Sequence, residues 1–325
     1  MARAREPFAI PSESSARAAW WIAGFRVLTL PPLLFGREHR FEAEVEGRTV
    51  RIACIGFPRR FDALLKEIFG AIALVGRGSV RASWRPLSLS RLDADLIAVD
   101  VHRVFLGGFS RSGWLIVPEE VRWRGGLEEL PPSSPTESLR SDIRKVERLG
   151  YRLEEAGSPS DWEEFFESMV VPHLVARFGE NAKLPGRAAR KTLRRRGTLL
   201  FIGREGVREG GACLLRTPRG VLLRRLGIRD GDPGLLREGV LTALYLGLFE
   251  WSRERGYREF DAGTTLPLPR QGLARYKAKL GLEPAPSPIA LTAAFHFDHE
   301  DAALASCFRR SPLLHEVDGR VETYP

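Results

Sequence analysis

The spacing of apolar positions separates the chain into two halves. In the first half short β-like runs predominate, and they predict strands at residues 48–56, 79–87, 95–102 and 113–118. One segment among them, 61–70 ("FDALLKEIFG"), has helical spacing and a glycine at its end, which is typical of a helix stop. The first half is therefore predicted to be a small mixed α/β unit.

The second half has a more regular order. Apolar residues at helical spacing predict helices at 138–149, from a capping box at 160–163 to about residue 178, at 187–196, and at 235–255. Alternating or continuous apolar runs predict strands at 151–156, 198–203, 211–217, 221–228 and 257–263. A loop and a short basic helix follow the last strand.

This order predicts where a ligand would bind. A strand that arrives after a long helix usually lies parallel to a neighbour already in the sheet. Ligands of such sheets settle at the carboxyl ends of the strands. Asp261 and Gly263 lie at that end of strand 257–263.

A proline- and serine-rich stretch, 129–138 ("ELPPSSPTES"), interrupts the regular pattern. A chain of 325 residues is also longer than one compact core usually needs. We therefore expect two units, 1–135 and 136–325.

Positive charge is concentrated in one region. The chain has a formal net charge of +9, and 15 of its Lys/Arg residues against 4 Asp/Glu lie between Lys183 and Arg237. Such a surplus favours an anionic partner, such as tRNA, a phosphate-bearing cofactor or an anionic lipid precursor. The alternative is a solvated, arginine-rich surface.

The cysteines and the apolar segments bear on location. Three cysteines, far apart and without a CxxC pair, favour a reducing cytoplasm. The apolar segment 18–36 contains Arg26 and the pair Pro31-Pro32, so a spanning helix is not expected there. We interpret it as core or as a surface that meets a membrane.

Lysine is rare in this chain, and this makes Lys277 and Lys279 conspicuous. Only six lysines stand among fifty basic residues, and these two lie one residue apart. Lysine supplies a compact charge whose pKa can shift, as is needed close to an oxyanion or a phosphate. At helical spacing the two point to different faces, and we expect Lys277 to be the inward one. The alternative is an exposed helix end that complements the helix dipole.

Other polar groups allow two interpretations each. Asp261 could orient or deprotonate an amine, or could form a turn with Gly263. The turn that begins at Arg229 ("RDGDPG") could hold a phosphate on its amides, although it is no P-loop. The cluster 296–301 ("HFDHED") offers metal-type ligands but is more typical of a solvated turn, and we expect no metal. No nucleophile motif is present, which favours direct transfer without a covalent enzyme intermediate.

Two motifs resemble a known group. "SLRSDIRKVERLG" (138–150) and "GYREFDAGTTLPLPRQGLARYKAKLG" (256–281) are similar to motifs of the Fem-type aminoacyltransferases and of GNAT-like N-acyltransferases, including those labelled cellulose-biosynthesis-type acetyltransferases. The resemblance implies an α/β (α+β) fold of tandem GNAT-like units, with mixed, mostly antiparallel sheets flanked by helices. It implies that Lys277 meets the charge formed during acyl transfer and that Tyr276 lines the donor channel. It also implies that Arg140 and Arg144 contact phosphate.

The sequence departs from that group in three ways, and the first is that Ala262 stands where the strand end of that group usually has Phe. Residues 179–197 are too short for the helical arm of Fem-type enzymes, and the stretch 224–234 does not reproduce the coenzyme A turn of GNAT enzymes. The donor, a coenzyme A thioester or an aminoacyl-tRNA, therefore stays open. The expected acceptor is an amine on a small molecule or a cell-envelope precursor, and a peripheral membrane contact is one further expectation. The alternative is a non-catalytic protein that binds tRNA or anionic lipid through Lys183–Arg237.

Overall fold

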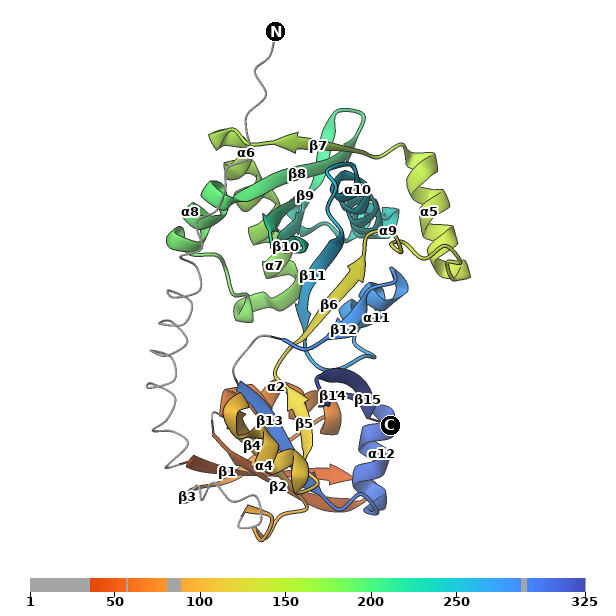
Figure 1. Ribbon diagram of the computed structural model, residues 1–325. Helices are drawn as coiled ribbons and strands as arrows, with labels where there is room; N and C mark the ends of the chain where they lie inside the picture. Colours follow the sequence, from red (N-terminus) through yellow and green to blue (C-terminus); the bar gives the residue numbers. More distant parts are fainter. Residues whose placement is uncertain (1–35, 57, 81–88, 288–290, 325) are drawn as a thin grey trace. The chain divides into compact units, whose positions relative to one another are not determined.

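The computed structural model describes residues 36–56, 58–80, 89–287 and 291–324 (Figure 1). They form two compact units. Unit 1 takes the chain up to Glu119 and again Ile289–Ser311, whereas unit 2 takes Glu120–Pro288 and Pro312–Tyr324. The apolar segment 18–35 lies outside the described residues. No helix in the described part of the chain combines the length and apolarity needed to cross a membrane.

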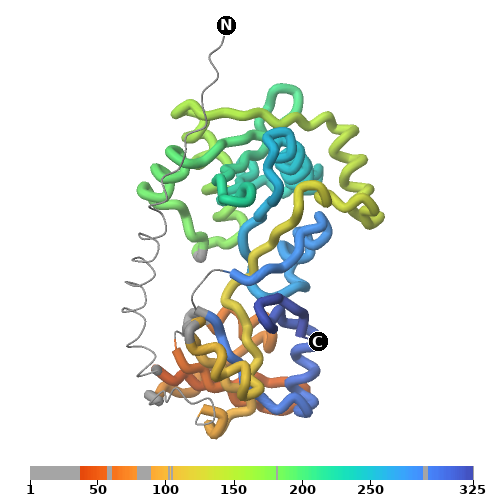
Figure 2. Tube along the Cα trace, viewed as in Figure 1, coloured from red at the N-terminus to blue at the C-terminus, as the bar shows by residue number. Residues whose placement is uncertain are grey.

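The division differs from the expected boundary at 135/136, and strand pairing explains the difference. Strand β6 (Val121–Gly126) precedes the proline-rich stretch but already pairs with two strands of unit 2. Strand β13 (Leu291–Phe297) returns to unit 1 and pairs with strands on both sides of it. In Figure 2 this blue strand lies among the orange and yellow strands of unit 1. Backbone pairing, which composition does not reveal, therefore sets the boundary.

Unit 1 is built on a six-stranded sheet with the order β3-β1-β2-β4-β13-β5. Its elements are β1 (Gly36–Val45), β2 (Arg48–Ile55), α2 (Pro58–Phe69), β3 (Ala73–Val80), β4 (Leu96–His102), α4 (Leu106–Arg111), β5 (Leu115–Pro118), β13 and α12 (Ala302–Arg310). The predicted strands at 48–56, 95–102 and 113–118 and the helix at 61–70 are confirmed. The strand expected at 79–87 falls mostly outside the described residues, and β1 was not expected although Phe41, Ala43 and Val45 alternate along it and are buried.

Unit 2 is built on a seven-stranded sheet with the order β12-β6-β11-β10-β9-β8-β7. Its strands are β6, β7 (Arg152–Ala156), β8 (Gly197–Arg204), β9 (Val207–Arg216), β10 (Gly220–Ile228), β11 (Glu259–Thr265) and β12 (Glu283–Ala285), and a separate ribbon pairs β14 (Leu313–Val317) with β15 (Arg320–Tyr324). The strands expected in this half are all found. Each sheet has one parallel pair, β10 with β11 and β2 with β4, and its other pairs are antiparallel. The expected mixed, mostly antiparallel α/β fold class is confirmed.

The helices of unit 2 are α5 (Glu137–Leu149), α6 (Pro159–Glu164), the π-helix η2 (Phe165–Val170), α7 (Val171–Phe178), α8 (Arg187–Arg196), α9 (Pro233–Glu238), α10 (Val240–Glu254) and α11 (Gly272–Lys279). Two expectations were wrong in detail. The capping box uses Ser158 and Asp161 rather than Ser160 and Glu163. The helix expected at 235–255 breaks at Gly239, whose φ of 94° ends α9 and starts α10.

The π-helix η2 lies directly on the sheet because two glycines leave room for it. A Cβ on Gly227 of β10 would stand 2.5 Å from backbone atoms of Met169 and Val170. A Cβ on Gly211 of β9 would stand 2.9 Å from the Phe165 ring. Since either contact is shorter than real Cβ atoms allow, only glycine permits this close packing.

Candidate active site

The parallel pair of unit 2 separates where the sequence predicted a ligand site. The register of β10 and β11 covers only Gly220 to Leu222 on one strand and Glu259 to Asp261 on the other. Beyond Leu222 and Asp261, β10 continues to Ile228 and β11 to Thr265 without pairing with each other. The predicted parallel arrangement is thus confirmed, and the two strands diverge toward their carboxyl ends.

A bulge in each strand accompanies this divergence. In β10, Arg224 is the extra residue opposite β9, because Leu223 pairs with Leu214 and Arg225 with Cys213. In β11 the register with β6 shifts between Asp261 and Thr264. Gly263, inside that second bulge, has a φ of 73°, a value that favours glycine. Bulges of this kind bend strands apart and are frequent beside active sites.

Asp261 is 4% exposed and fully engaged. Its Oδ1 accepts a hydrogen bond of 2.9 Å from the Gly263 amide, as the turn interpretation expected. Its Oδ2 lies 3.2 Å from Arg122 and 3.3 Å from Arg124, both on β6. Because both oxygens have partners, the carboxylate anchors the strand end.

The two arginines were missed by the sequence analysis. Arg124 stands directly opposite Asp261 in the antiparallel register of β6 and β11. The signal was present, since Val121-Arg122-Trp123-Arg124 alternates between apolar and charged residues as a strand with one buried face does. The Nε atoms of both arginines are buried, and among the described residues neither Nε atom has a hydrogen-bond partner.

Lys277 points inward, as expected. It is 2% exposed and shares the buried side of α11 with Ala274, three residues earlier. Its Nζ donates to the carbonyl oxygens of Gly263 at 3.2 Å and Thr264 at 3.3 Å. The ammonium nitrogen therefore sits against the bulged end of β11, where the two strands have parted.

Burial lowers the pKa of Lys277 to about 7, since the charged form loses its hydration. The negative charges of Asp261 and Glu120 raise this pKa, and the positive charge of Arg177 lowers it. Glu120 is itself held by a 2.7 Å hydrogen bond from the Thr264 hydroxyl. At neutral pH, Lys277 is therefore divided between its charged and neutral forms.

Tyr276 packs in the core of unit 2 beside this lysine. Its hydroxyl lies 3.0 Å from the Thr242 hydroxyl of α10, and its ring meets the edge of Tyr245 with centroids 5.7 Å apart. Burial raises the pKa of both tyrosines. The structure thus brings together Lys277, Asp261 and Gly263, with Tyr276 on the adjacent helical position.

Lys279, on the same helix, contacts α5 and not the end of β11. Its Nζ lies 2.7 Å from the Ser138 hydroxyl and 2.7 Å from Asp142, both on α5. The arginines of α5 turn elsewhere. Arg140 donates to the Pro135 carbonyl, and Arg144 pairs with Glu137 at 2.9 Å. Both are exposed, and among the described contacts neither arginine meets Lys277.

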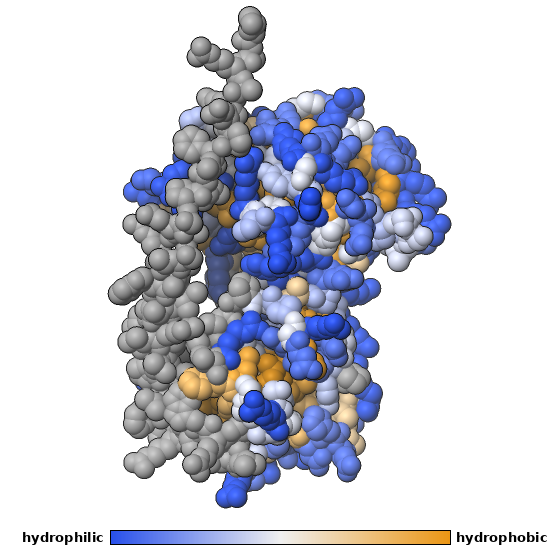
Figure 3. All heavy atoms as spheres, in the orientation of Figure 1, coloured by the Kyte–Doolittle hydropathy of each residue, from blue (hydrophilic) through white to orange (hydrophobic). Residues whose placement is uncertain are grey.

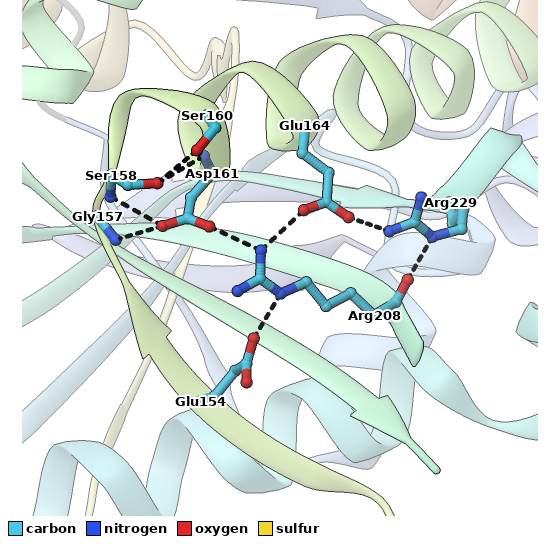
Figure 4. A network of polar contacts seen from close by, with 8 residues as sticks. All are labelled: Glu154, Gly157, Ser158, Ser160, Asp161, Glu164, Arg208 and Arg229. Carbon is cyan, nitrogen blue, oxygen red and sulfur yellow. Dashed lines mark hydrogen bonds and ion pairs between the residues drawn. The ribbon is translucent and has the colours of Figure 1, made fainter. Parts of the chain in front are cut away.

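Arg229, the expected phosphate ligand, belongs to a network of intramolecular bonds (Figure 4). It donates to Glu164 and to the Arg208 carbonyl. Arg208 in turn contacts three carboxylates, those of Glu154, Asp161 and Glu164. Asp161 also accepts from Ser158 in the capping box, and these bonds lower its pKa. The network ties α6 to β7 and β9, and the Arg229 side chain takes part in it through bonds within unit 2.

Arginines near the diverging strands supply positive charge. Arg225, one residue after the β10 bulge, is half-buried, and burial together with Arg224 lowers its pKa. Arg177 of α7 is exposed, yet its charge lowers the pKa of Lys277 and of His173. In the described part of the chain neither Arg225 nor Arg177 has an ion pair. Neither position was indicated by the sequence pattern beyond general basicity.

The candidate metal ligands at 296–301 are separate in their contacts. His296 stacks on Trp114 with centroids 5.0 Å apart, and His299 packs against Phe297. Asp301 caps α12 through the amides of Ala303 and Leu304. Within 36–56, 58–80, 89–287 and 291–324, no group of three or more metal-type side chains occurs.

The basic region divides into two kinds of residue. Four arginines are held in ion pairs with carboxylates, namely Arg190, Arg204, Arg208 and Arg229. Others are exposed, and on the face that Figure 3 shows, most visible residues of unit 2 are hydrophilic. The exposed ones include Lys183, Arg187, Lys191, Arg194, Arg195, Arg196, Arg216, Arg219, Arg224 and Arg237.

Comparison with solved structures finds similar folds. FemX is similar over 85% of this chain and 86% of its own, with 12% identity and a TM-score of 0.43. The C-terminal domain of an Agrobacterium fabrum protein assigned as a lysylphosphatidylglycerol synthetase is similar over 82% of this chain and 87% of its own, with 14% identity and a TM-score of 0.41. A GCN5-related N-acetyltransferase from Kribbella flavida is similar over 96% and 78%, with 13% identity and a TM-score of 0.30.

No protein-family model and no curated protein matches the sequence. At identities of 12–14% and TM-scores of 0.30–0.43, these likenesses carry no argument about this chain. The chemistry has to be argued from the residues of this chain.

Proposed function

We propose that unit 2 is an N-acyltransferase that works by direct attack of an amine on an activated acyl group. The observation that carries the proposal is the position of Lys277. Its nitrogen is buried and bonded to two carbonyl oxygens at the point where β10 and β11 have parted. A buried lysine with a pKa of about 7 at a strand end is typical of functional sites.

In this proposal the ammonium form of Lys277 donates its remaining hydrogen to the oxygen that becomes negative during transfer. The acceptor nitrogen forms the new C–N bond, and the bond between the acyl carbon and the thiol or hydroxyl carrier breaks. The proton lost by the amine goes to the leaving group through solvent. Such stabilisation of a developing oxyanion contributes about 10²–10³-fold to turnover. The negative charge of Asp261 raises the pKa of Lys277, and so increases the fraction of this lysine that is in the ammonium form.

The donor in this proposal carries phosphate. Arg225 is half-buried beside the divergence, and its neighbour Arg224 adds a second positive charge. An anion there would offset the burial of Arg225. A coenzyme A thioester and an aminoacyl-tRNA both meet this requirement. The acceptor is an amine on a sugar, a peptide or a lipid-linked molecule, and both units are proposed to be GNAT-like.

Two measurements test the proposal. Thermal shifts with acetyl-coenzyme A, coenzyme A and aminoacyl-tRNA identify the donor. Release of the thiol or tRNA is then measured over a panel of amines for the wild type, Lys277→Met, Lys277→Arg and the control Lys279→Met. We expect Lys277→Met to lose about 100-fold or more of turnover with its fold intact. Lys277→Arg should also be poor, because a guanidinium fork cannot replace a compact ammonium. A wild-type rate in Lys277→Met would exclude this role.

A second candidate is a binding protein without catalysis, and the exposed cations of the basic region favour it. Its affinity for tRNA would fall steeply with salt, because phosphate contacts release counterions. If tRNA binds with such a slope while no amine in the panel is acylated, the binding interpretation replaces the enzymatic one. If tRNA does not bind at low salt, the basic region has another role.

A further inference from the structure

The segment from the end of α7 through α8 is strongly basic. Residues 175–196 contain eight Lys/Arg and a single acidic residue, Glu180. Among the described residues, only Arg190 of these eight has an ion pair, with Glu167 of η2. The exposed cations are Arg177, Lys183, Arg187, Lys191, Arg194, Arg195 and Arg196.

Helix α8 is anchored by few contacts and leaves these charges outward. Leu193 is its buried residue, at 5% exposed, and it packs in a cluster with Trp162 and Phe166. Arg190 lies over the Phe166 ring, 5.0 Å from its centroid, and donates to the Pro185 carbonyl. The helix is therefore fixed on one side, and its other side presents charge to solvent.

Large apolar side chains lie within the same segment. Val175 is 47% exposed, Phe178 48% and Leu184 48%. Val175 and Phe178 are three residues apart on α7 and so share one face of that helix. Single exposed apolar residues are ordinary, but three within residues 175–184, in the same segment as cations without an ion pair, make this segment amphipathic. We call these three residues and the exposed cations the α7–α8 surface.

We propose that the α7–α8 surface docks unit 2 onto an anionic lipid bilayer, with Val175, Phe178 and Leu184 entering the headgroup boundary. Cations beside exposed apolar side chains are the pattern that binds such interfaces. A single-stranded nucleic acid would instead require aromatic platforms, and Phe178 is the one exposed aromatic residue that these 22 positions offer. The proposal is independent of the proposed acyl transfer, since it concerns neither Lys277 nor β11.

The test is cosedimentation of the full chain with vesicles of phosphatidylcholine alone and with about 30% phosphatidylglycerol. We expect binding to the anionic vesicles at low salt and weaker binding as salt rises. The variant Lys191→Ala/Arg194→Ala/Arg195→Ala keeps helix-forming residues in α8. Each cation near an anionic surface contributes about fivefold, so this variant should lower the partition coefficient about 100-fold.

Matched variants separate the surface from net charge. Arg216→Ala/Arg219→Ala/Arg237→Ala removes the same charge at exposed positions outside the α7–α8 surface. Phe178→Asp tests the apolar component, with Val207→Asp, 55% exposed in the wild type, as its control. We expect strong loss of vesicle binding only in Lys191→Ala/Arg194→Ala/Arg195→Ala, here called the α8 triple, and in Phe178→Asp.

Three results would overturn the proposal. The first is no binding of the wild type to anionic vesicles at low salt. The second is an equal loss in the two charge variants, which would indicate a net-charge effect. The third is tight binding to RNA that the α8 triple abolishes, with no loss of vesicle binding in Phe178→Asp. Circular dichroism confirms that each variant is folded.

Discussion

Replacement of Lys277 by methionine should change how the stability of the protein depends on pH. Methionine has a similar length, fills the same buried space and carries no charge, so the packing of α11 on β11 should survive. What disappears is a proton-binding group whose pKa differs between the folded and unfolded chain. That pKa is 10.5 in the unfolded reference and about 7 in the folded protein.

The sign of the effect follows from that order. Between about pH 7 and pH 10.5 the unfolded chain binds a proton at this lysine and the folded chain does not, so wild-type stability rises with pH. Below pH 7 both states are charged, and the folded state bears the full penalty of burying the ammonium. Relative to Lys277→Met, the wild-type free energy of unfolding should therefore increase by about 2–3 kcal/mol from about pH 6.5 to about pH 9.

Urea unfolding at several pH values, followed by circular dichroism, measures this difference. Lys279→Met is the control, because it removes a lysine from the same helix but leaves the buried one in place. Because Lys279→Met keeps Lys277, its stability should show the same rise between about pH 6.5 and pH 9 as the wild type. Parallel pH curves for the wild type and Lys277→Met would contradict this expectation, since they would show that burial does not lower the pKa of the lysine.

Three other perturbations have defined outcomes. Gly227→Ala should cost about 1–3 kcal/mol, because its Cβ would collide with the backbone of η2, whereas Gly157→Ala, with nothing within 4 Å, should change stability by less than about 1 kcal/mol in the same urea assay. Asp261→Asn removes a charge that raises the pKa of Lys277. In an Asp261→Asn background, the free energies of unfolding with Lys277 and with Lys277→Met should therefore begin to diverge at a lower pH than in the wild-type background, and divergence at a higher pH would contradict this. Tyr276→Phe loses the hydrogen bond with Thr242 and should lower the free energy of unfolding by about 1 kcal/mol, and an unchanged thermal midpoint would show that this bond contributes nothing.

Local pattern was sufficient to predict most elements of unit 2. The apolar spacing of 138–149, with Gly150 after it, predicted α5 because its cap and stop are written in adjacent residues. The π-helix could not be predicted in this way. It depends on Gly211 and Gly227, which are distant in sequence from η2 and become informative only once the sheet has formed.

The same distinction holds for the candidate site. The inward position of Lys277 followed from helical spacing, and the turn at Asp261 followed from its glycine. Arg122 and Arg124 lie far from Asp261 in sequence and reach it through cross-strand register, which no local window contains. The turn at Arg229 was expected to offer its amides to a phosphate, and this stays a prediction. The Arg229 side chain donates to Glu164, because the fold places α6 beside the turn.

The return of β13 to unit 1 affects how the chain can be synthesised and divided. This strand lies between β4 and β5, and β5 has no other partner in the described sheet. During synthesis the Glu120–Pro288 segment of unit 2 leaves the ribosome before β13 does. Amino-terminal domains usually fold first, but unit 1 cannot complete its sheet until β13 has been made. Cutting the gene after Glu119 should consequently yield an amino-terminal fragment whose last strand is left without a neighbour.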